Sequence, residues 1–338
     1  MTATRVVAVD AMGGDHGVSV TVPASLQALQ RDPTLEVLLV GQTAVLRPAV
    51  TVAPSELQSR LRLVEAPDVV GMGERPSSVL RARRRSSLWL ALEAVQQGQA
   101  QACVSAGNTG AIMALGRHLL KTFAGVDRPA IVTQLPTSSG HCQILDLGAN
   151  VDLTSDHLYQ FAVMGSVLAS AVGGVQSPTV GLLNIGEEAI KGREQIQVAA
   201  ELMARSDWLN YVGYIEGDGI WSGAADVVVC DGFTGNVALK ASEGLAKLID
   251  ERVALAFSAN WRGRALGLLA RPVLQSLRSQ IDPGRYNGAS FLGLQGIVVK
   301  SHGASGVDAF AHAVKTAAKE IEQNVAARIN ERLEALLV

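Results

Sequence analysis

The strongest constraint on the fold is the regular alternation of short apolar segments with segments in which apolar residues recur at helical spacing. Strands are expected at 5–10, 35–41, 61–65, 130–134, 143–147, 179–183, 211–216, 227–230 and 296–300, with a further short strand closing at 103–104. Helices are expected at 43–47, 78–97, 157–172, 193–204, 237–249 and 307–336, the last of them broken at some point. This pattern predicts an α/β/α sandwich on a mostly parallel sheet, organised as a single domain over 1–338 because no convincing linker divides the chain.

Composition agrees with this architecture and excludes several classes of protein. The chain is 48% hydrophobic, 18% charged and 4% aromatic, with 34 glycines, which suits a parallel sheet covered by helices. A formal charge of −2 gives no reason to expect a nucleic-acid partner. Three cysteines in apolar surroundings are typical of a reduced, cytoplasmic protein. The longest apolar helix candidate, 161–175, is shorter than the roughly 20 residues of a membrane span, so a soluble or peripheral protein is expected.

The segment CVSAGNTGAIMALG, residues 103–116, reads as a strand, a glycine-rich turn and the start of a helix. The first turn of such a helix leaves backbone N–H groups unpaired, and the helix dipole favours an anion there. Gly107 and Gly110 would allow an anion to approach the backbone closely. The alternative is a helix capped by Asn108 or Thr109 with no ligand.

Small polar turns also follow other predicted strands, at 10–15, 146–150 and 231–236, and a fifth at 183–186 leads to Lys191. Ligands of open parallel sheets lie just beyond the carboxyl ends of strands, so these turns are expected to gather on one edge as a phosphate-type site. Tight turns that serve only compact packing are the alternative. The chain has no dinucleotide-binding glycine fingerprint after the first strand, no Walker A loop, no serine-hydrolase elbow and no metal-ligand spacing among its histidines.

These motifs, in this order, resemble the bacterial acyl-acyl-carrier-protein:phosphate acyltransferases of phospholipid synthesis. The matching stretches are VAVDAMGGDHG, CVSAGNTGAIMALGR with VDRPAI after it, LDLGANVD, FAVMGSVLA, GLLNIGEEAIKG, ADVVVCDGFTGNVALKASEG and YNGASFLGLQGIVVKSHG, which run from Val7 to Gly303. Two small departures, Val18 and the segment 304–307, remove no group assigned to chemistry.

The resemblance implies transfer of a long fatty acyl group from acyl-carrier protein to inorganic phosphate, giving acyl phosphate. It implies a Rossmann-like α/β/α sandwich similar to phosphotransacetylases and isopropylmalate dehydrogenases, with no metal or organic cofactor. It also implies a homodimer, a cytoplasmic location with peripheral contact to the inner face of the cell membrane, and a downstream glycerol-3-phosphate acyltransferase as a further partner.

Phosphate is already an anionic nucleophile at neutral pH, so the site must mainly desolvate it, position it and stabilise the developing oxyanion. The expected catalytic residues are Lys191, Asn236, Asp231 and Asp10. The expected phosphate- and substrate-binding residues are Gly13, Gly14, Ser105, Gly107, Asn108, Thr109, Gly110, Asp146, Asn150, Asn184, Thr234, Gly235, Lys240 and His302, with Lys300 as a weaker candidate. A solvated lysine and plain turn-capping carboxylates are the alternatives, and a thioester on Cys103, Cys142 or Cys230 is a minor one.

The segment 253–281 is cationic and amphipathic. Its expected membrane-facing residues are Leu266, Leu269, Val273 and Leu277, and Arg264, Arg271 and Arg278 repeat every seven residues. Packing in a dimer interface is an alternative that is compatible with membrane contact. A basic run at 81–85, expected on the 78–97 helix, is a candidate docking patch for the acidic carrier protein, or simply a solvated helix face.

Three other functions remain open at the level of sequence. A phosphotransacetylase-like enzyme would use acyl-coenzyme A, a dehydrogenase would share the general fold, and a non-catalytic membrane scaffold would recruit the lipid pathway. Donor preference, nicotinamide binding, and the effect of removing Lys191 and Asn236 separate these hypotheses.

Overall fold

The computed structural model describes residues 4–138, 140–281 and 288–337, and of residues 275–281 and 337 only the backbone. Its eleven strands form one sheet in the order β3-β2-β1-β4-β11-β10-β5-β6-β9-β7-β8. The strands are β1 (Arg5–Asp10), β2 (Leu35–Gly41), β3 (Leu61–Glu65), β4 (Ala102–Ser105), β5 (Ala130–Thr137), β6 (Gly140–Leu145), β7 (Thr179–Leu183), β8 (Asn210–Ile215), β9 (Val227–Val229), β10 (Ala289–Leu292) and β11 (Ile297–Lys300).

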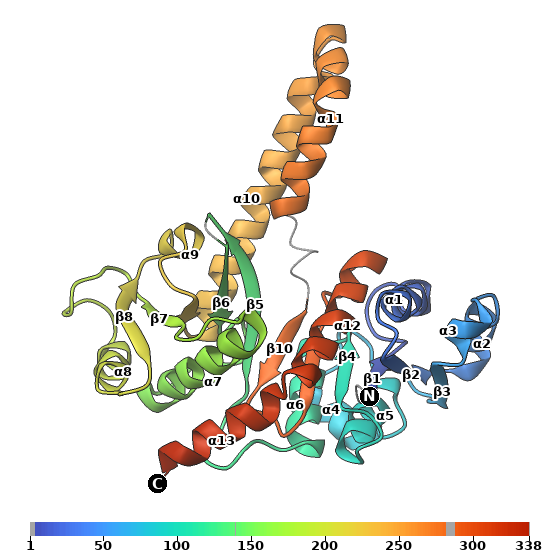
Figure 1. Cartoon of the computed structure of the whole chain (residues 1–338), viewed down its shortest axis with the longest axis horizontal. Helices are drawn as coiled ribbons and strands as arrows, with labels where there is room; N and C mark the ends of the chain where they lie inside the picture. Colours follow the sequence, from blue (N-terminus) through green and yellow to red (C-terminus); the bar gives the residue numbers. More distant parts are fainter. Residues whose placement is uncertain (1–3, 139, 282–287, 338) are drawn as a thin grey trace.

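Helices cover both faces of this sheet, which confirms the predicted α/β/α sandwich (Figure 1). One face packs against α1 (Val18–Arg31), α2 (Thr43–Thr51), α7 (Ser155–Gly173), α8 (Glu194–Ala204), α12 (Val307–Glu322) and α13 (Val325–Leu337). The other packs against α4 (Pro76–Ala82), α5 (Ser87–Gln96), α6 (Thr109–Leu119) and the short α9 (Gly219–Ser222). The short α3 (Ser55–Gln58) follows α2.

The sheet consists of two parallel groups that run in opposite directions. Strands β3, β2, β1, β4 and β11 are parallel to one another, and so are β6, β9, β7 and β8. Three successive antiparallel pairings, β11 with β10, β10 with β5 and β5 with β6, join the groups and reverse the direction between them. The sequence expectation that all the glycine turns share one edge is therefore wrong.

Register nevertheless brings the turns of both groups to the same face. One transverse row of paired residues crosses the sheet and consists of Val9, Val104, Val299, Ser290, Val132, Leu145, Val229 and Leu182. Asp10, Ser105 and Lys300 lie one residue beyond this row in one direction, and Asp146 and Cys230 one residue beyond it in the other. Because side chains alternate between faces along a strand, all five point to the face that α5 and α6 cover.

Several helix boundaries differ from those predicted. The single helix expected at 78–97 is two helices, α4 and α5, separated by a turn in which the Ser86 side chain accepts a hydrogen bond from the Trp89 N–H and caps α5. The expected break in the C-terminal helix is confirmed between α12 and α13. Strand β10 was not predicted, because its four residues follow a segment with no clear pattern.

The helix expected at 237–249 is instead a 27-residue helix, α10 (Gly232–Ser258), which already begins inside the predicted glycine turn. It pairs with α11 (Trp261–Ile281) in a hairpin that projects away from the sheet (Figure 1). Gly263 and Gly267 face the ring and backbone of Phe257 on α10, so small residues allow the two helices to approach closely. Among the described residues, no helix is both long and apolar enough to cross a membrane.

Candidate active site

The turns after β1 and β4 are joined by a buried carboxylate. The Ser105 hydroxyl donates to Asp10 Oδ2 at 2.7 Å and accepts from the Gly107 N–H at 3.0 Å. A Cβ on Gly13 would lie 2.5 Å from the same carboxylate oxygen, so only glycine fits there. Burial raises the pKa of Asp10, and hydrogen bonds from neighbouring groups oppose that shift. Asp10 and Ser105 therefore fix the positions of these two turns.

The N-terminus of α6 is capped by Asn108. Its side-chain oxygen accepts from the Ala111 N–H at 3.0 Å, and its amide donates to the carbonyls of Met72 and Glu74. The structure thus confirms Asn108 as the N-cap. These hydrogen bonds hold the 72–74 loop against α6. Because the Asn108 amide is already bound, the polar groups that remain in this turn are the first backbone groups of the helix, at Thr109 and Gly110.

In the second parallel group, Asp146 organises the turn after β6. Its two carboxylate oxygens accept from the backbone N–H groups of Ile131, Ala149 and Asn150, and from the Asn150 side chain, at 2.7–3.1 Å. Burial nevertheless raises the pKa of Asp146. Because four donors bind it, this carboxylate fixes the conformation of the loop. The Asn150 carbonyl accepts a hydrogen bond from the Gly232 N–H and so connects the loop to the start of α10.

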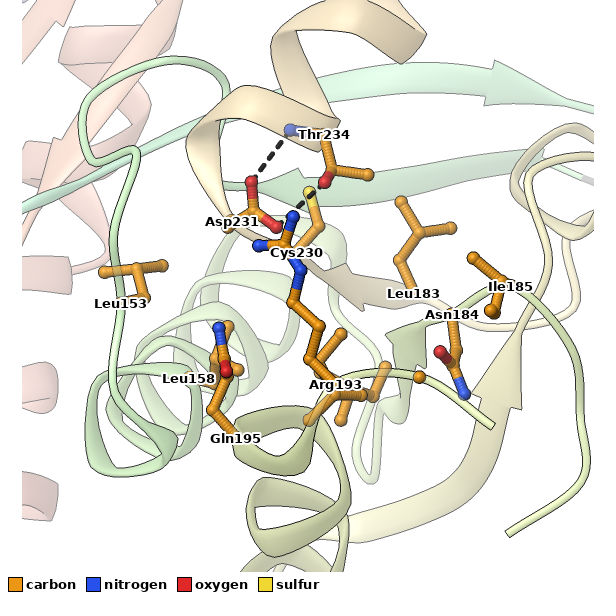
Figure 2. A pocket seen from close by; sticks show the side chains of 13 residues that line it. Leu153, Leu158, Leu183, Asn184, Ile185, Arg193, Gln195, Cys230, Asp231 and Thr234 are labelled. Carbon is orange, nitrogen blue, oxygen red and sulfur yellow. Dashed lines mark hydrogen bonds between the residues drawn. The ribbon is translucent and has the colours of Figure 1, made fainter. Parts of the chain in front are cut away.

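The first turn of α10 packs directly on this loop. Asp231 caps the helix by accepting from both the backbone N–H and the hydroxyl of Thr234, each at 2.8 Å (Figure 2). Gly235 is buried, and a Cβ there would lie 2.0 Å from the Asp146 carbonyl oxygen. Asn236 is exposed and lies beside Gly148. The predicted residues of the 146–150 and 231–236 turns are therefore brought together.

Lys191, the expected cation for phosphate, lies on the loop after β7 and is partly exposed. Its ammonium pairs with Glu188 on its own loop at 2.7 Å, and this hydrogen bond raises the pKa of Lys191. The buried Asn184 holds that loop by donating to the carbonyls of Gly186 and Lys191. Glu188 thus offsets the charge of Lys191 within the same loop. Arg193, two residues further on, lines the neighbouring pocket. Sequence reasoning missed Arg193, although its position directly before α8 was a usable signal.

The two groups of turns are connected by α10. Lys240, in its third turn, interacts electrostatically with Lys300 and His302 at the end of β11. Burial, followed by the charge of Lys240, lowers the pKa of Lys300 to about 8, and Asp15 opposes that shift. Burial and the two lysine charges also lower the pKa of His302. We call Lys240, Lys300 and His302 the cationic cluster. It contains Lys240 and His302, two of the expected substrate-binding residues, and Lys300, a weaker candidate.

A pocket of about 440 Å³ lies beside the first turn of α10 (Figure 2). Its lining residues are Leu153, Leu158, Leu182, Leu183, Asn184, Ile185, Gly192, Arg193, Gln195, Ile196, Cys230, Asp231 and Thr234. Arg193 extends from the start of α8 toward Asp231 and Thr234. The described residues contain no group of His, Cys, Asp and Glu side chains arranged to hold a metal ion.

Of the remaining predicted surfaces, that on α11 lies away from these turns (Figure 1), whereas the basic run at 81–85 adjoins the loop that Asn108 holds. On α11, Leu266, Leu269 and Val273 are 60%, 78% and 71% exposed, whereas the side chain of Leu277 lies outside the described residues. The basic run at 81–85 does not form a continuous helix face, because α4 ends at Ala82. Arg83 pairs there with Glu74 at 3.0 Å, and the Arg84 guanidinium lies over the Trp89 ring.

The fold defines the class of protein. A phosphotransacetylase from Staphylococcus aureus superposes with a TM-score of 0.62 at 15% identity, and one from Streptococcus pyogenes with a TM-score of 0.60 at 18% identity, each over 94% of both chains. This chain therefore has the phosphotransacetylase fold.

Sequence comparison is more specific. A family model described as "Fatty acid synthesis protein" matches residues 5–328. The phosphate acyltransferase of Pseudomonas paraeruginosa is 54% identical over 98% of this chain and 99% of its own length, and that of Halorhodospira halophila is 54% identical over 100% and 98%. The chain belongs to the phosphate acyltransferase family.

Proposed function

We propose that this chain, acting as one domain, transfers a long fatty acyl group from acyl-carrier protein to inorganic phosphate and so supplies acyl phosphate for phospholipid synthesis. Family membership supports acyl transfer to phosphate. The observation that carries the site assignment is the cationic cluster, where a partly desolvated Lys300 lies near a second lysine at the meeting point of the two groups of turns. The half-buried Lys300 ammonium, near the exposed Lys240 that pairs with Glu243 at 2.7 Å, favours a bound anion.

The reaction needs a positioned anion more than it needs a base. A phosphate oxygen attacks the thioester carbonyl carbon, a tetrahedral oxyanion forms, and the C–S bond then breaks to release the carrier thiol after it takes up a proton. The N–H and hydroxyl of Thr234 already donate to Asp231, and the N–H groups of Gly232 and Gly235 donate to backbone carbonyls. The exposed Asn236 side chain is therefore the suitable donor for that oxyanion. Lys240 and Lys300 would hold the phosphate on the opposite side of the carbonyl.

A covalent enzyme thioester is disfavoured by the state of the thiols. Cys103, Cys142 and Cys230 are all buried. Burial raises the pKa of Cys142 to about 12 and raises the pKa of Cys103 and Cys230 well above the usual value for a thiol. Because the thiolate is the nucleophilic form, these residues are poor candidates for accepting an acyl group. Direct attack by phosphate is the mechanism that the geometry supports.

The test of the function is phosphate-dependent release of free carrier thiol from palmitoyl-acyl-carrier protein. We expect release with phosphate, no release without it, and a much lower kcat/KM with palmitoyl-coenzyme A as the donor. Equal turnover on both donors would instead support the phosphotransacetylase-like alternative. Release that does not depend on phosphate would contradict acyl transfer to phosphate altogether.

We also propose that the α10–α11 hairpin is the peripheral membrane contact of a cytoplasmic homodimer and the surface from which acyl phosphate reaches a glycerol-3-phosphate acyltransferase. Its exposed apolar residues support this proposal: Leu245, Leu248, Leu255, Trp261, Leu266, Leu268, Leu269 and Val273. Arg264 and Arg271 lie on the same projecting helix, and an arrangement of apolar and cationic residues suits an anionic bilayer. No helix of the described residues spans a membrane, so contact would be interfacial.

Replacing Leu266 and Leu269 together by serine is expected to lower binding to anionic phospholipid vesicles about tenfold or more, because each leucine loses its apolar transfer free energy. Co-sedimentation with the vesicles measures this. The matched control replaces two exposed valines on the opposite end of the sheet, Val45 and Val52, and should leave binding unchanged. Sedimentation equilibrium of the same variants reports the dimer. Unchanged vesicle binding with a weakened dimer would assign the hairpin to the subunit interface instead.

A further inference from the structure

The residues that line the pocket beside α10 do not include those of the cationic cluster, and many of them are aliphatic. Leu153, Leu158, Leu182 and Leu183 are buried and form its apolar part, and Ile185 and Ile196 continue this surface toward its mouth. The volume of about 440 Å³ lies within the range of pockets that enclose small-molecule ligands. Exposing this much aliphatic surface to water is unfavourable, so an apolar ligand of matching size would be stabilised there.

We propose that this pocket receives the fatty acyl chain of the donor and sets the chain-length preference of the enzyme. The inference rests on the proposed function, and it adds the location of the uncharged part of the substrate. The occupant is an aliphatic chain, because the interior offers methyl and methylene groups from two helices and a strand, while the polar residues Asn184, Arg193 and Gln195 come from the loop before α8 and from its start.

The charges around the mouth support this division of the substrate. Arg193 and Asp231 both line the pocket, and the Arg193 side chain extends in the direction of Asp231 (Figure 2). Asp231 also accepts two hydrogen bonds from Thr234 and remains committed to the helix cap. A phosphate dianion in the pocket would be repelled by this carboxylate, which opposes its attraction to Arg193. An anion is better placed at Lys300 of the cationic cluster, where Lys240 already pairs with Glu243 at 2.7 Å, and the pocket is left for the neutral chain.

The position of the pocket along α10 fits a thioester held between the two sites. Thr234 lines the pocket and Lys240 belongs to the cationic cluster. Six residues of α-helix separate them, which corresponds to about 9 Å of helix rise. An acyl chain in the pocket would therefore place its carbonyl near the first turn of α10, within reach of a phosphate bound one to two turns further along. The Asn184 amide binds the carbonyls of the 185–192 loop and so holds this loop at the polar side of the pocket.

The test uses Ile196→Trp, which fills the pocket, and Val198→Trp as the matched control. Both residues lie on α8, but Val198 is 41% exposed and does not line the pocket. The measurement is kcat/KM for phosphate-dependent transfer from carrier protein loaded with octanoyl, lauroyl or palmitoyl groups. Each methylene that can no longer enter should lower kcat/KM about fourfold. We expect roughly 60-fold loss on palmitoyl donor for three excluded methylenes, less than threefold loss on octanoyl donor, and no change in the control.

A loss that is equal for all chain lengths in Ile196→Trp, or the same profile in Val198→Trp, would overturn the proposal. Circular dichroism checks that both variants are folded, and Ile196→Phe replaces the larger substitution if Ile196→Trp is not. Displacement of fluorescent cis-parinaric acid by palmitate, without phosphate or carrier protein, tests the pocket separately. If the wild-type protein binds palmitate, Ile196→Trp does not, and the wild-type protein transfers no acyl group to phosphate, the pocket assignment stands and the proposed reaction is refuted. Equal palmitate binding by both proteins would refute the pocket.

Discussion

Lys300→Met is expected to lower kcat/KM for phosphate by about 100-fold or more, with a smaller effect on KM for the acyl donor. The ammonium of Lys300 lies largely out of solvent, where an interaction with a phosphate anion and its developing transition state is stronger than at the surface. Steady-state kinetics at saturating acyl-carrier protein measure the change. Lys315→Met removes the same charge from an exposed position on α12 and serves as the control. A Lys300→Met enzyme with wild-type kcat/KM would remove the cationic cluster from the mechanism.

The pH dependence of the same variants has a definite sign. The pKa of Lys300 is about 8, lowered by burial and then by Lys240, so the cationic form that binds phosphate is lost as the pH rises through about 8. Lys240→Met removes a repelling charge, raises the pKa of Lys300 and should move the alkaline decline in kcat/KM to higher pH. Because the pKa of Lys300 in the folded chain lies below the value of 10.5 for a free lysine, its contribution to the free energy of unfolding should increase between about pH 8 and 10.5. An alkaline limb that stays in place in Lys240→Met would contradict the assignment.

Gly235→Ala is expected to lower the free energy of unfolding by about 3 kcal/mol or more and to abolish transfer. An alanine Cβ would lie 2.0 Å from the Asp146 carbonyl oxygen and 2.8 Å from Cys230 Sγ, so the start of α10 must move away from the turn after β6. Alanine is otherwise the better helix former, which makes a loss at this position informative. Chemical denaturation and the phosphate-dependent release assay measure the two effects.

Gly244→Ala is the matched control for this change. It lies in the same helix, where no atom within 4 Å would meet a new Cβ, and it should stabilise the chain by roughly 0.5–1 kcal/mol without changing transfer. If both substitutions gave the same small stabilisation, the close contact between α10 and the Asp146 turn would not contribute to stability.

Much of the fold follows from local pattern. The strands Arg5–Asp10, Leu35–Gly41, Leu61–Glu65 and Thr179–Leu183 have the bounds that periodicity predicts, because each is a continuous apolar segment between turn-forming residues. The two-helix structure of 78–97 was missed because its apolar spacing continues across the turn, and the Ser86 cap that divides it depends on a single side chain. The long α10 was cut short because its glycines and exposed surface resemble a turn followed by an ordinary helix.

The candidate site was predicted less completely than the fold. The sequence locates the polar turns, but it does not distinguish a residue committed to the chain from one facing a substrate. Asp146 and Asn108 both proved to have their polar atoms engaged by backbone groups, and Lys191 its charge matched by Glu188. Nothing in the sequence signals that Lys300 is partly buried, because its burial depends on neighbours far apart in the chain, such as Lys240 and Asp15.

The sequence by itself determined the alternation of strands and helices, the positions of the glycine turns and the family likeness, because each depends on residues close together or on whole motifs. Only the tertiary structure decided that the two parallel groups of strands run in opposite directions and that register, not a shared edge, places Asp10, Lys300 and Asp146 on one face. The physical reason is that the decisive pairings, β10 with β5 and β11 with β4, join segments more than 150 residues apart in the chain. A shift of one residue would turn each of these side chains to the other face of the sheet.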